Sequence, residues 1–302
     1  MEPGDLAAVT TGECTDLYYV DTGMYDTAGY GSVYILDADE VAIVDTGIGT
    51  HYERILDALD ELDIAREDVA YLVVTHVHLD HAGGAGYLAE ACPNATVAVH
   101  ERGARHLADP SRLWEGTKAA VGDQIEWYVE PKPVDEDRIE ELQDGDVLKL
   151  GDHALHATEA PGHAPHQLVF YDPSNDAVFT ADAAGIYVPS IDDVRETTPP
   201  PQFDLEQALS DVETIKEIDP STLLYAHFGP VSADDLLDAY PERLESWVGT
   251  VEAVRAELED DEAVVDHFAD DPEMADIWGM EKASGETAMN VRGVLRYLDG
   301  RP

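Results

Sequence analysis

The chain has 302 residues, 44% of them hydrophobic, and its 17 Lys and Arg stand against 65 Asp and Glu, a formal net charge of −48. The length suffices for a full-sized core, while the acidity argues against nucleic acid and anionic membranes as partners, since both bind cationic surfaces. No run reaches the roughly 18 apolar residues of a membrane span, and residues 1–14 lack the basic-then-apolar order of a secretion signal. Cys14 and Cys92 follow no pairing pattern, which favours reduced thiols and a cytoplasmic location.

The acidic residues are spread along the chain rather than gathered in one tail. A charge excess of this size destabilises a compact chain through self-repulsion. In molar salt the screening length falls to about 3 Å, and the same surface becomes tolerable. We therefore expect a halophilic protein, with an acidic surface that faces a partner as the alternative.

From residue 30 onward, short β-rich runs alternate with amphipathic segments, beginning with strands predicted over Ser32–Leu36 and Val41–Val44. Residues 51–62 have apolar side chains at helical spacing. Residues 71–75 form a continuous apolar run, typical of a strand that is buried on both faces. The next candidates are a short helix over Ala85–Ala91, a strand over 96–99 and a helix that begins at Glu101.

Residues 108–145 lack clear periodicity and contain three prolines. Long irregular segments in compact domains are often functional, so we expect a wall or lid of a binding site here and a second one at residues 183–201. Strand signals resume after residue 145, with one amphipathic helix over Leu205–Ile218 among them. The strand candidates are 147–150, 154–158, 167–171, 177–180 and 223–226.

After Pro230 the strand signals stop and only helical patterns remain, for example over residues 244–258. This order of elements predicts an α/β catalytic domain over residues 1–232, with helices outside two central sheets. Residues 233–302 are then a helical C-terminal extension, which could cover a cleft or form the face of a homodimer.

The densest cluster of chemistry-bearing residues is the segment THVHLDHAGG at 75–84, directly after the apolar run at 71–75. Loops that leave the carboxyl end of a buried strand commonly carry functional sites. If this loop begins extended, His76 and His78 point to the same side, and the turn through Asp80 and His81 aims two more ligands at a neighbouring position. Three of twelve histidines within six residues have no evident packing role. Imidazole and carboxylate together suit zinc, iron or manganese.

The segment HVHLDH resembles the HxHxDH signature of the metallo-β-lactamase superfamily. Four further segments resemble landmarks of that family in the same order along the chain. They are 41–47 (VAIVDTG), 160–163 (APGH), 179–182 (FTAD) and 226–230 (AHFGP). The similarity spans about residues 30–232 and implies a four-layer αββα sandwich, here with the C-terminal helical extension.

The resemblance also implies a site for two divalent metal ions, with zinc expected and iron or manganese as alternatives. One ion would be bound by His76, His78 and His163, and the other by Asp80, His81 and His227, with Asp182 and a hydroxide bridging both. Asp80 and Asp182 are the predicted catalytic carboxylates. Two ions about 3.5–4 Å apart can activate a shared water and polarise a carbonyl or phosphoryl oxygen.

Three further residues are candidates beside this set. Asp45 would orient a metal ligand by resemblance, or would only form a turn. His166 follows the third histidine where the family usually has a small residue and a glycine, so it could contact substrate or simply begin a strand. Tyr187 could steady a substrate oxygen, as tyrosines do in related lactonases, although its spacing differs from theirs.

The predicted activity is metal-dependent hydrolysis of a small ester-like bond, with a thioester hydrolase resembling glyoxalase II ahead of a lactonase. The substrate would be a small molecule, and the C-terminal helices offer few cations for an anionic one. Those cations are Lys282, Arg292, Arg296 and Arg301. The alternatives are an iron-dependent redox enzyme of the same fold, which would act on persulfide or oxygen, and a nucleic-acid phosphodiesterase, against which the charge argues.

Overall fold

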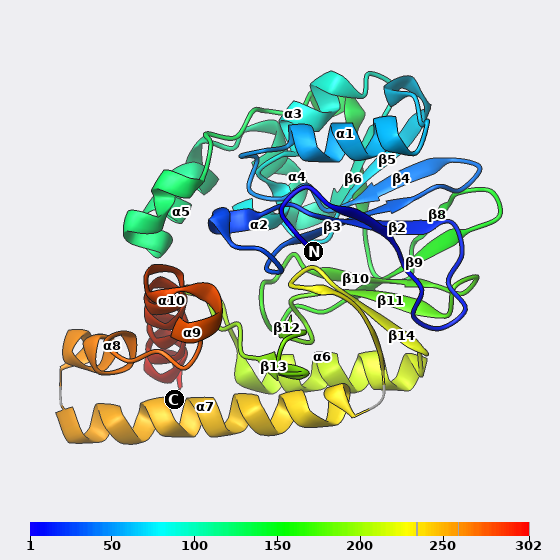
Figure 1. Ribbon diagram of the computed structural model, residues 1–302. Helices are drawn as coiled ribbons and strands as arrows, with labels where there is room; N and C mark the ends of the chain where they lie inside the picture. Colours follow the sequence, from blue (N-terminus) through cyan, green and yellow to red (C-terminus); the bar gives the residue numbers. More distant parts are fainter. Residues whose placement is uncertain (234, 259, 302) are drawn as a thin grey trace.

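The computed structural model describes residues 1–233, 235–258 and 260–301. Two β-sheets lie face to face, and helices cover the outer face of each, so that four layers are stacked (Figure 1). The predicted αββα sandwich is therefore confirmed. None of the helices in the described part of the chain combines the length and the apolar content needed to cross a bilayer.

The first sheet contains seven strands in sequence order. They are β1 Leu6–Ala8, β2 Leu17–Asp21, β3 Ser32–Leu36, β4 Val41–Val44, β5 Val69–Val74, β6 Thr96–His100 and β7 Ile139–Leu142. Strands β4 to β7 run parallel, because helices α1 (Glu53–Glu61), α3 (Ala85–Ala91) and α4 (Glu101–Ala108) lie on the connections between them. The sequences VAIV and VAYLVV of β4 and β5 are rich in β-branched residues, which suits strands in the middle of a covered sheet.

The second sheet has the strand order β15-β14-β11-β10-β9-β8. Its strands are β8 Val147–Lys149, β9 Ala154–Glu159, β10 Leu168–Asp172, β11 Ala177–Ala181, β14 Thr222–Tyr225 and β15 Gly229–Ser232. Helix α6 (Leu205–Ile218) joins the parallel strands β11 and β14, and the small hairpin β12 (Ile186–Val188) and β13 (Asp193–Arg195) precedes it. The carboxyl ends of β11 and β14 thus lie side by side.

Apolar side chains fill the space between the sheets and the space under each helical layer. Between the sheets, Tyr34 and Val44 of the first sheet pack with Phe170, Phe179 and Leu224 of the second. A second cluster lies between the first sheet and α1, α3 and α4, and a third joins the second sheet to α6 and the C-terminal helices.

Helices make up the last part of the chain, and the predicted boundary at residue 232 falls between β15 and the first of them. They are α7 Leu236–Leu258, α8 Asp261–Ala269, α9 Ala275–Trp278 and α10 Met280–Gly300. Val251 of α7 and Val294 of α10 belong to the same apolar cluster as Val212 of α6. Helix α10 also approaches α5 (Ser111–Val121), so the last helix lies beside a segment from the first half of the chain (Figure 1).

Two features of the fold differ from the sequence prediction. Residues 108–145 contain α5 and β7 rather than only irregular chain, because the prolines flank α5 instead of interrupting it. Strand signals do not stop after Pro230, since this residue lies within the edge strand β15. A proline is tolerated there because the outer side of an edge strand needs no N–H donor.

Candidate metal centre

The HxHxDH segment lies in the loop that leaves strand β5. His76 and His78 follow the strand, and the one-turn helix α2 (Leu79–Ala82) carries Asp80 and His81. The turn after β4 fixes this helix, because Thr46 donates both its backbone N–H and its hydroxyl to the His81 carbonyl at 2.7 Å. The motif thus places four side chains at the end of strand β5, in a loop that backbone hydrogen bonds hold in position.

The second sheet supplies three more side chains of the ligand type. His163 lies in the loop from β9 to β10, Asp182 directly follows β11, and His227 lies between β14 and β15. Gly162 lets the first of these loops lie against α6, since a Cβ atom there would be 2.2 Å from the backbone nitrogen of Ala208. Its N–H donates to the buried carboxylate of Asp211 on α6 at 2.6 Å, so this helix positions the loop of His163.

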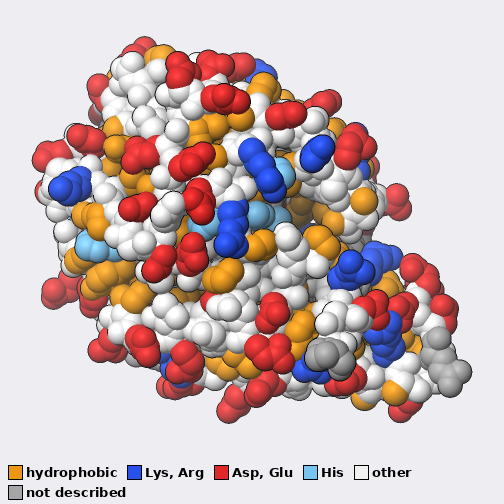
Figure 2. All heavy atoms as spheres, turned by 180° about the vertical axis from the view of Figure 1, so that it is seen from behind, with side chains coloured by type: hydrophobic (Ala, Val, Ile, Leu, Met, Phe, Trp, Pro, Cys, Tyr) orange, Lys and Arg blue, Asp and Glu red, His pale blue; other side chains and the backbone are white. Residues whose placement is uncertain are grey.

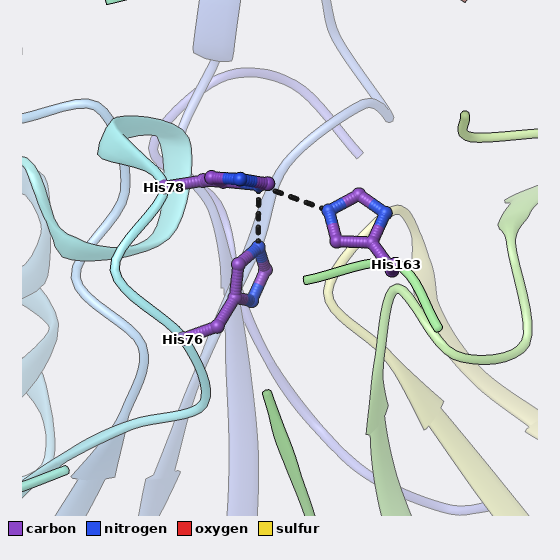
Figure 3. Close-up of side chains that lie close together, drawn as sticks. All are labelled: His76, His78 and His163. Atoms are coloured by element: carbon purple, nitrogen blue, oxygen red, sulfur yellow. Dashed lines mark hydrogen bonds between the residues drawn. The ribbon is translucent and has the colours of Figure 1, made fainter. Parts of the chain in front are cut away.

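All seven predicted ligands are brought together from the two sheets. They form three groups in which the ligand atoms lie within 4.8 Å of one another: His76, His78 and His163; His76, His81 and Asp182; and Asp80, His81 and His227. In the first group the ring nitrogens face inward, with His78 Nδ1 at 3.1 Å from His76 Nε2 and 2.9 Å from His163 Nε2 (Figure 3).

The Asp182 carboxylate connects the groups. Its Oδ2 lies 3.2 Å from His163 Nε2, and its Oδ1 lies 3.4 Å from His81 Nε2. One carboxylate therefore reaches the histidines of both halves of the cluster, which is the geometry a bridging ligand requires.

Hydrogen-bond partners fix which ring nitrogen faces the cluster. Asp45 Oδ2 lies 2.9 Å from His81 Nδ1, and the Tyr30 carbonyl lies 3.1 Å from His227 Nδ1. These acceptors hold a proton on Nδ1 and leave the Nε2 lone pair free for a cation. Asp45 is itself held by the backbone N–H and the hydroxyl of Thr75, at 2.9 and 2.8 Å.

The charge states of His76, His78 and Asp182 fit a divalent cation. His81 differs, because burial lowers its pKa but Asp182, Asp45 and Asp80 outweigh burial and the net shift is upward. Burial, together with the neighbouring imidazoles, lowers the pKa of His76 far below its usual range and that of His78 to about 3, so both rings are neutral. Burial raises the pKa of the Asp182 carboxyl, but His163 and His81 outweigh it and the net shift is downward. Neutral imidazole and ionised carboxylate are the forms that bind metal.

An orphaned polar atom supports the same assignment. Among the described residues, the buried Asp182 Oδ1 has no hydrogen-bond partner. A buried carboxylate oxygen without a partner is costly, and a bound cation removes that cost. Five imidazoles and two carboxylates form a donor set of the kind that holds zinc or a similar ion.

His166 lies next to the cluster but does not belong to the three groups. Its ring stacks parallel to that of His76 with 6.2 Å between centroids, and the Val77 N–H donates to its Nδ1 at 3.5 Å. Burial and the nearby His78 lower its pKa to about 2, so the ring is neutral. It lines a cavity that adjoins the cluster.

Tyr187 is not brought to the cluster. Its hydroxyl donates to Asp192 at 2.9 Å, and its ring packs 5.7 Å from that of Tyr225. The contact with the site runs instead through the backbone, where the Tyr187 N–H donates to the His227 carbonyl.

Aromatic and charged residues without a motif complete the wall of the site. Tyr25, Tyr30 and Tyr128 line it together with Glu286 from α10. Tyr30 packs 5.0 Å from His227 and donates its hydroxyl to Glu286 at 3.0 Å. The sequence offers no spacing signal for this group, because its members come from segments more than 90 residues apart.

The cations expected on the C-terminal helices are mostly occupied. Lys282 is buried, lies 2.6 Å from Glu286 and stacks on the rings of Tyr25 and Tyr30. Arg292 pairs with Glu262, and Arg301 pairs with Glu206. Lys282 therefore joins α10 to the site wall and is not available to bind an anionic substrate. This corrects its place among the candidate cations.

Two cavities meet at the cluster. The first, of about 60 Å³, is lined by His78, Asp80, His163, Asp182 and His227, and by residues of both segments expected to form a wall, among them Thr117 and Pro199. The second, of about 890 Å³, is lined by His78 and His166 and by α4 and α5. A volume of 60 Å³ holds only a few waters or ions, whereas the larger cavity has room for an organic molecule.

This combination of an αββα sandwich with a histidine- and carboxylate-rich centre at the joint edge of both sheets defines a class of metal-site proteins. The sequence profile of the metallo-beta-lactamase superfamily matches residues 26–227. The chain belongs to this superfamily.

Several members are similar along much of the chain. The metallo-beta-lactamase fold-containing protein ST1585 of Sulfurisphaera tokodaii is 28% identical over 225 residues, which are 72% of this chain and 80% of that protein. Its crystal structure superposes with a TM-score of 0.70 at 22% identity and covers 93% of this chain and 99% of that one.

Two relatives of named type match a shorter part. Diflavin flavoprotein A 1 of Synechocystis is 29% identical over 174 residues, 57% of this chain and 26% of that protein. The human acyl-coenzyme A thioesterase MBLAC2 is 26% identical over 193 residues, 55% of this chain and 62% of that protein. The chain thus spans only part of the length of both.

Proposed function

We propose that the protein is a dinuclear metal-dependent hydrolase that cleaves a small ester-like bond, a thioester before a lactone. The observation that carries this proposal is the convergence of seven ligand side chains, with Asp182 reaching histidines of both halves. Zinc is the metal we expect, because five imidazoles and two carboxylates match its ligand preference.

Divalent cations bound here would supply Lewis acidity toward a carbonyl oxygen and would lower the pKa of water. The side chains of the chain itself have separate tasks. Asp45 and the Tyr30 carbonyl hold His81 and His227 in the ligating tautomer. Asp80, which is 23% exposed, faces the small cavity, where a reacting carbonyl would lie beside the buried carboxylate of Asp182. The tyrosine and Glu286 wall limits the water that reaches this point.

The preference for a thioester draws support from the relative named as an acyl-coenzyme A thioesterase. It also fits the cavities, since a small space beside the metal ligands opens into a large one that could receive a bulky leaving group. Hydrolysis of a lactone opens the ring and releases no separate leaving group into this space.

The redox alternative draws support from the relative named as a diflavin flavoprotein. The aligned segment covers only 26% of the length of that protein. The nucleic-acid alternative finds no support in a charge of −48. Oxygen consumption by iron-loaded protein and a gel shift with RNA would identify these two functions.

The test is a hydrolysis screen with thioesters, lactones and phosphodiesters at high salt, on protein whose metal content has been measured. We expect turnover of a thioester by the zinc-loaded protein and a loss of at least about 100-fold in His78→Ala, together with loss of bound metal. His156→Ala, which removes an exposed histidine from β9, is the matched control and should keep full activity. Full activity of His78→Ala would overturn the proposal.

A further inference from the structure

The larger of the two cavities has an unusual concentration of positive charge. Arg102 and Arg105 on α4 and Arg112 on α5 line it, together with His106. The whole chain has only 17 Lys and Arg against 65 Asp and Glu. On the face seen in Figure 2, Lys and Arg side chains gather around a hollow with histidine beside it, whereas acidic side chains dominate the surroundings.

None of these three arginines forms a salt bridge among the described residues, although Arg112 adds to the hydrogen bonds of Ser111 in lowering the pKa of the Asp109 carboxyl. Among the described residues, no carboxylate oxygen lies within 4.0 Å of their guanidinium nitrogens, although most other cations of the chain have such a partner. Arg102 donates to the Pro165 carbonyl at 3.1 Å, which fixes its direction, and Arg105 donates to His106. The one acidic residue in the lining, Glu101, accepts a hydrogen bond from Gln143 at 2.6 Å. In so acidic a chain, three guanidinium groups without an ion-pair partner in one cavity indicate a site for an anion.

The cavity is continuous with the metal centre. His78, Thr117, Ala120 and Pro200 line both cavities. A substrate whose reacting bond lies beside Asp80 and Asp182 would therefore place its remaining part between α4, α5 and the loop at Pro200. At about 890 Å³ this space suits a ligand of nucleotide size.

We propose that this arginine cavity binds phosphate groups on the leaving group of the substrate, so that the protein acts on thioesters of a phosphorylated thiol carrier. The inference rests on the proposed hydrolase function and specifies its substrate class. Guanidinium groups bind phosphate through paired, charge-assisted hydrogen bonds. The apolar part of the lining, with Leu113, Ala119 and Pro165, suits the uncharged arm of such a carrier.

Calorimetric titration tests the binding step without any need for turnover. The probes are coenzyme A, which carries phosphates on a thiol arm, and pantetheine, which is the same arm without phosphate. We expect Arg105→Gln and Arg112→Gln each to weaken coenzyme A binding about tenfold, as expected for one lost charge-assisted contact, and to leave pantetheine binding unchanged. Arg66→Gln is the control, because this exposed arginine precedes β5, at the end of the strand opposite the metal ligands.

Kinetics test the same idea in the metal-loaded enzyme. An acyl-coenzyme A and the corresponding acyl-N-acetylcysteamine thioester, which lacks phosphate, should differ in their response. The arginine variants should raise KM about tenfold for the first substrate only, with little change in kcat, because the arginines lie away from the reacting bond.

Equal losses for both probes, or an equal loss in Arg66→Gln, would overturn the inference. Binding of pantetheine to the wild type as tightly as coenzyme A would overturn it as well. Arginine-dependent binding of coenzyme A without hydrolysis of any thioester would support the anion site and reject the hydrolase, so the two proposals fail separately.

Discussion

Asp45 orients the candidate metal ligand His81 without being one of the ligands itself. It follows strand β4, adopts a positive φ of 62°, and accepts hydrogen bonds from the Thr75 backbone, the Thr75 hydroxyl and His81. Its place in the turn and its hold on His81 are therefore parts of one arrangement. Sequence alone left these two roles as alternatives, because a turn-forming Asp and a ligand-orienting Asp look the same in a single chain.

We predict that Asp45→Asn lowers metal affinity about 10- to 100-fold, since the amide cannot accept from His81 as strongly and no longer fixes its tautomer. Competition with a chromogenic chelator measures the affinity. Asp57→Asn, on the exposed face of α1, removes the same charge and should bind metal like the wild type. If both variants bind metal equally well, Asp45 only shapes the turn.

The ligands could be predicted from sequence because each lies in a short segment with its own local pattern. Three histidines in six residues need no knowledge of distant contacts. Tyr30, Lys282 and Glu286 have no such pattern, and they meet only because α10 packs against the far side of the site. The structure does not bring Tyr187 to the cluster, because its hydroxyl donates a hydrogen bond to Asp192 instead of facing the metal ligands.

At the scale of elements, α6 determines where the His163 loop lies. Asp211 is buried on this helix and accepts from the Gly162 N–H and from Gln207 at 2.9 Å. Burial raises the pKa of Asp211 to about 6, although both hydrogen bonds oppose the shift. The folded protein therefore binds a proton here more readily than the unfolded chain, whose Asp titrates near 4.

The pH dependence of stability follows from this shift. The stabilising contribution of protonated Asp211 is fully present below about pH 4 and is lost as the pH rises through about 6. We expect Asp211→Asn to lack this term, so that the difference in unfolding free energy between wild type and variant changes between pH 4 and 7 by at most about 3 kcal/mol. Denaturant titrations of the metal-free proteins measure it, and a difference that is constant with pH would contradict the assignment.

Element prediction succeeded for the central strands β4 and β5 and for the long helix α6. It failed for the strands β1, β2, β7, β12, β13 and β15, of three to five residues each. Strands of this length gain their hydrogen bonds from a neighbouring strand rather than from a preference of their own residues. Such strands can therefore be identified only in the folded sheet, where their partner strands are present.

For the whole molecule, the excess of 48 negative charges is the dominant property, and acidic side chains cover much of the face seen in Figure 2. Adaptation to high salt, a cytoplasmic location and a homodimer stay predictions from the sequence. The first of them has a direct physical test, because screening acts on every surface charge at once.

We predict that the unfolding temperature rises on the order of 10 °C between about 0.1 M and 2 M KCl, as the screening length falls from about 10 Å to about 2 Å. Circular dichroism at fixed metal content measures the midpoint. Sucrose, an uncharged solute that is also excluded from protein surfaces, separates screening from exclusion and should give a much smaller rise. An unfolding temperature that is constant or falls with KCl would contradict salt adaptation.

The ligand set is divided between the sheets, with four members after β5 and three among the loops of β9, β11 and β14. Each of the three groups combines side chains from both sheets, so neither sheet completes any group alone. An ion bound by His76, His78 and His163, or one bound by Asp80, His81 and His227, would cross-link the two sheets. Stable metal binding during biosynthesis would then require that the second sheet has already packed against the first. A chain truncated before His227 would lack one side chain of the third group.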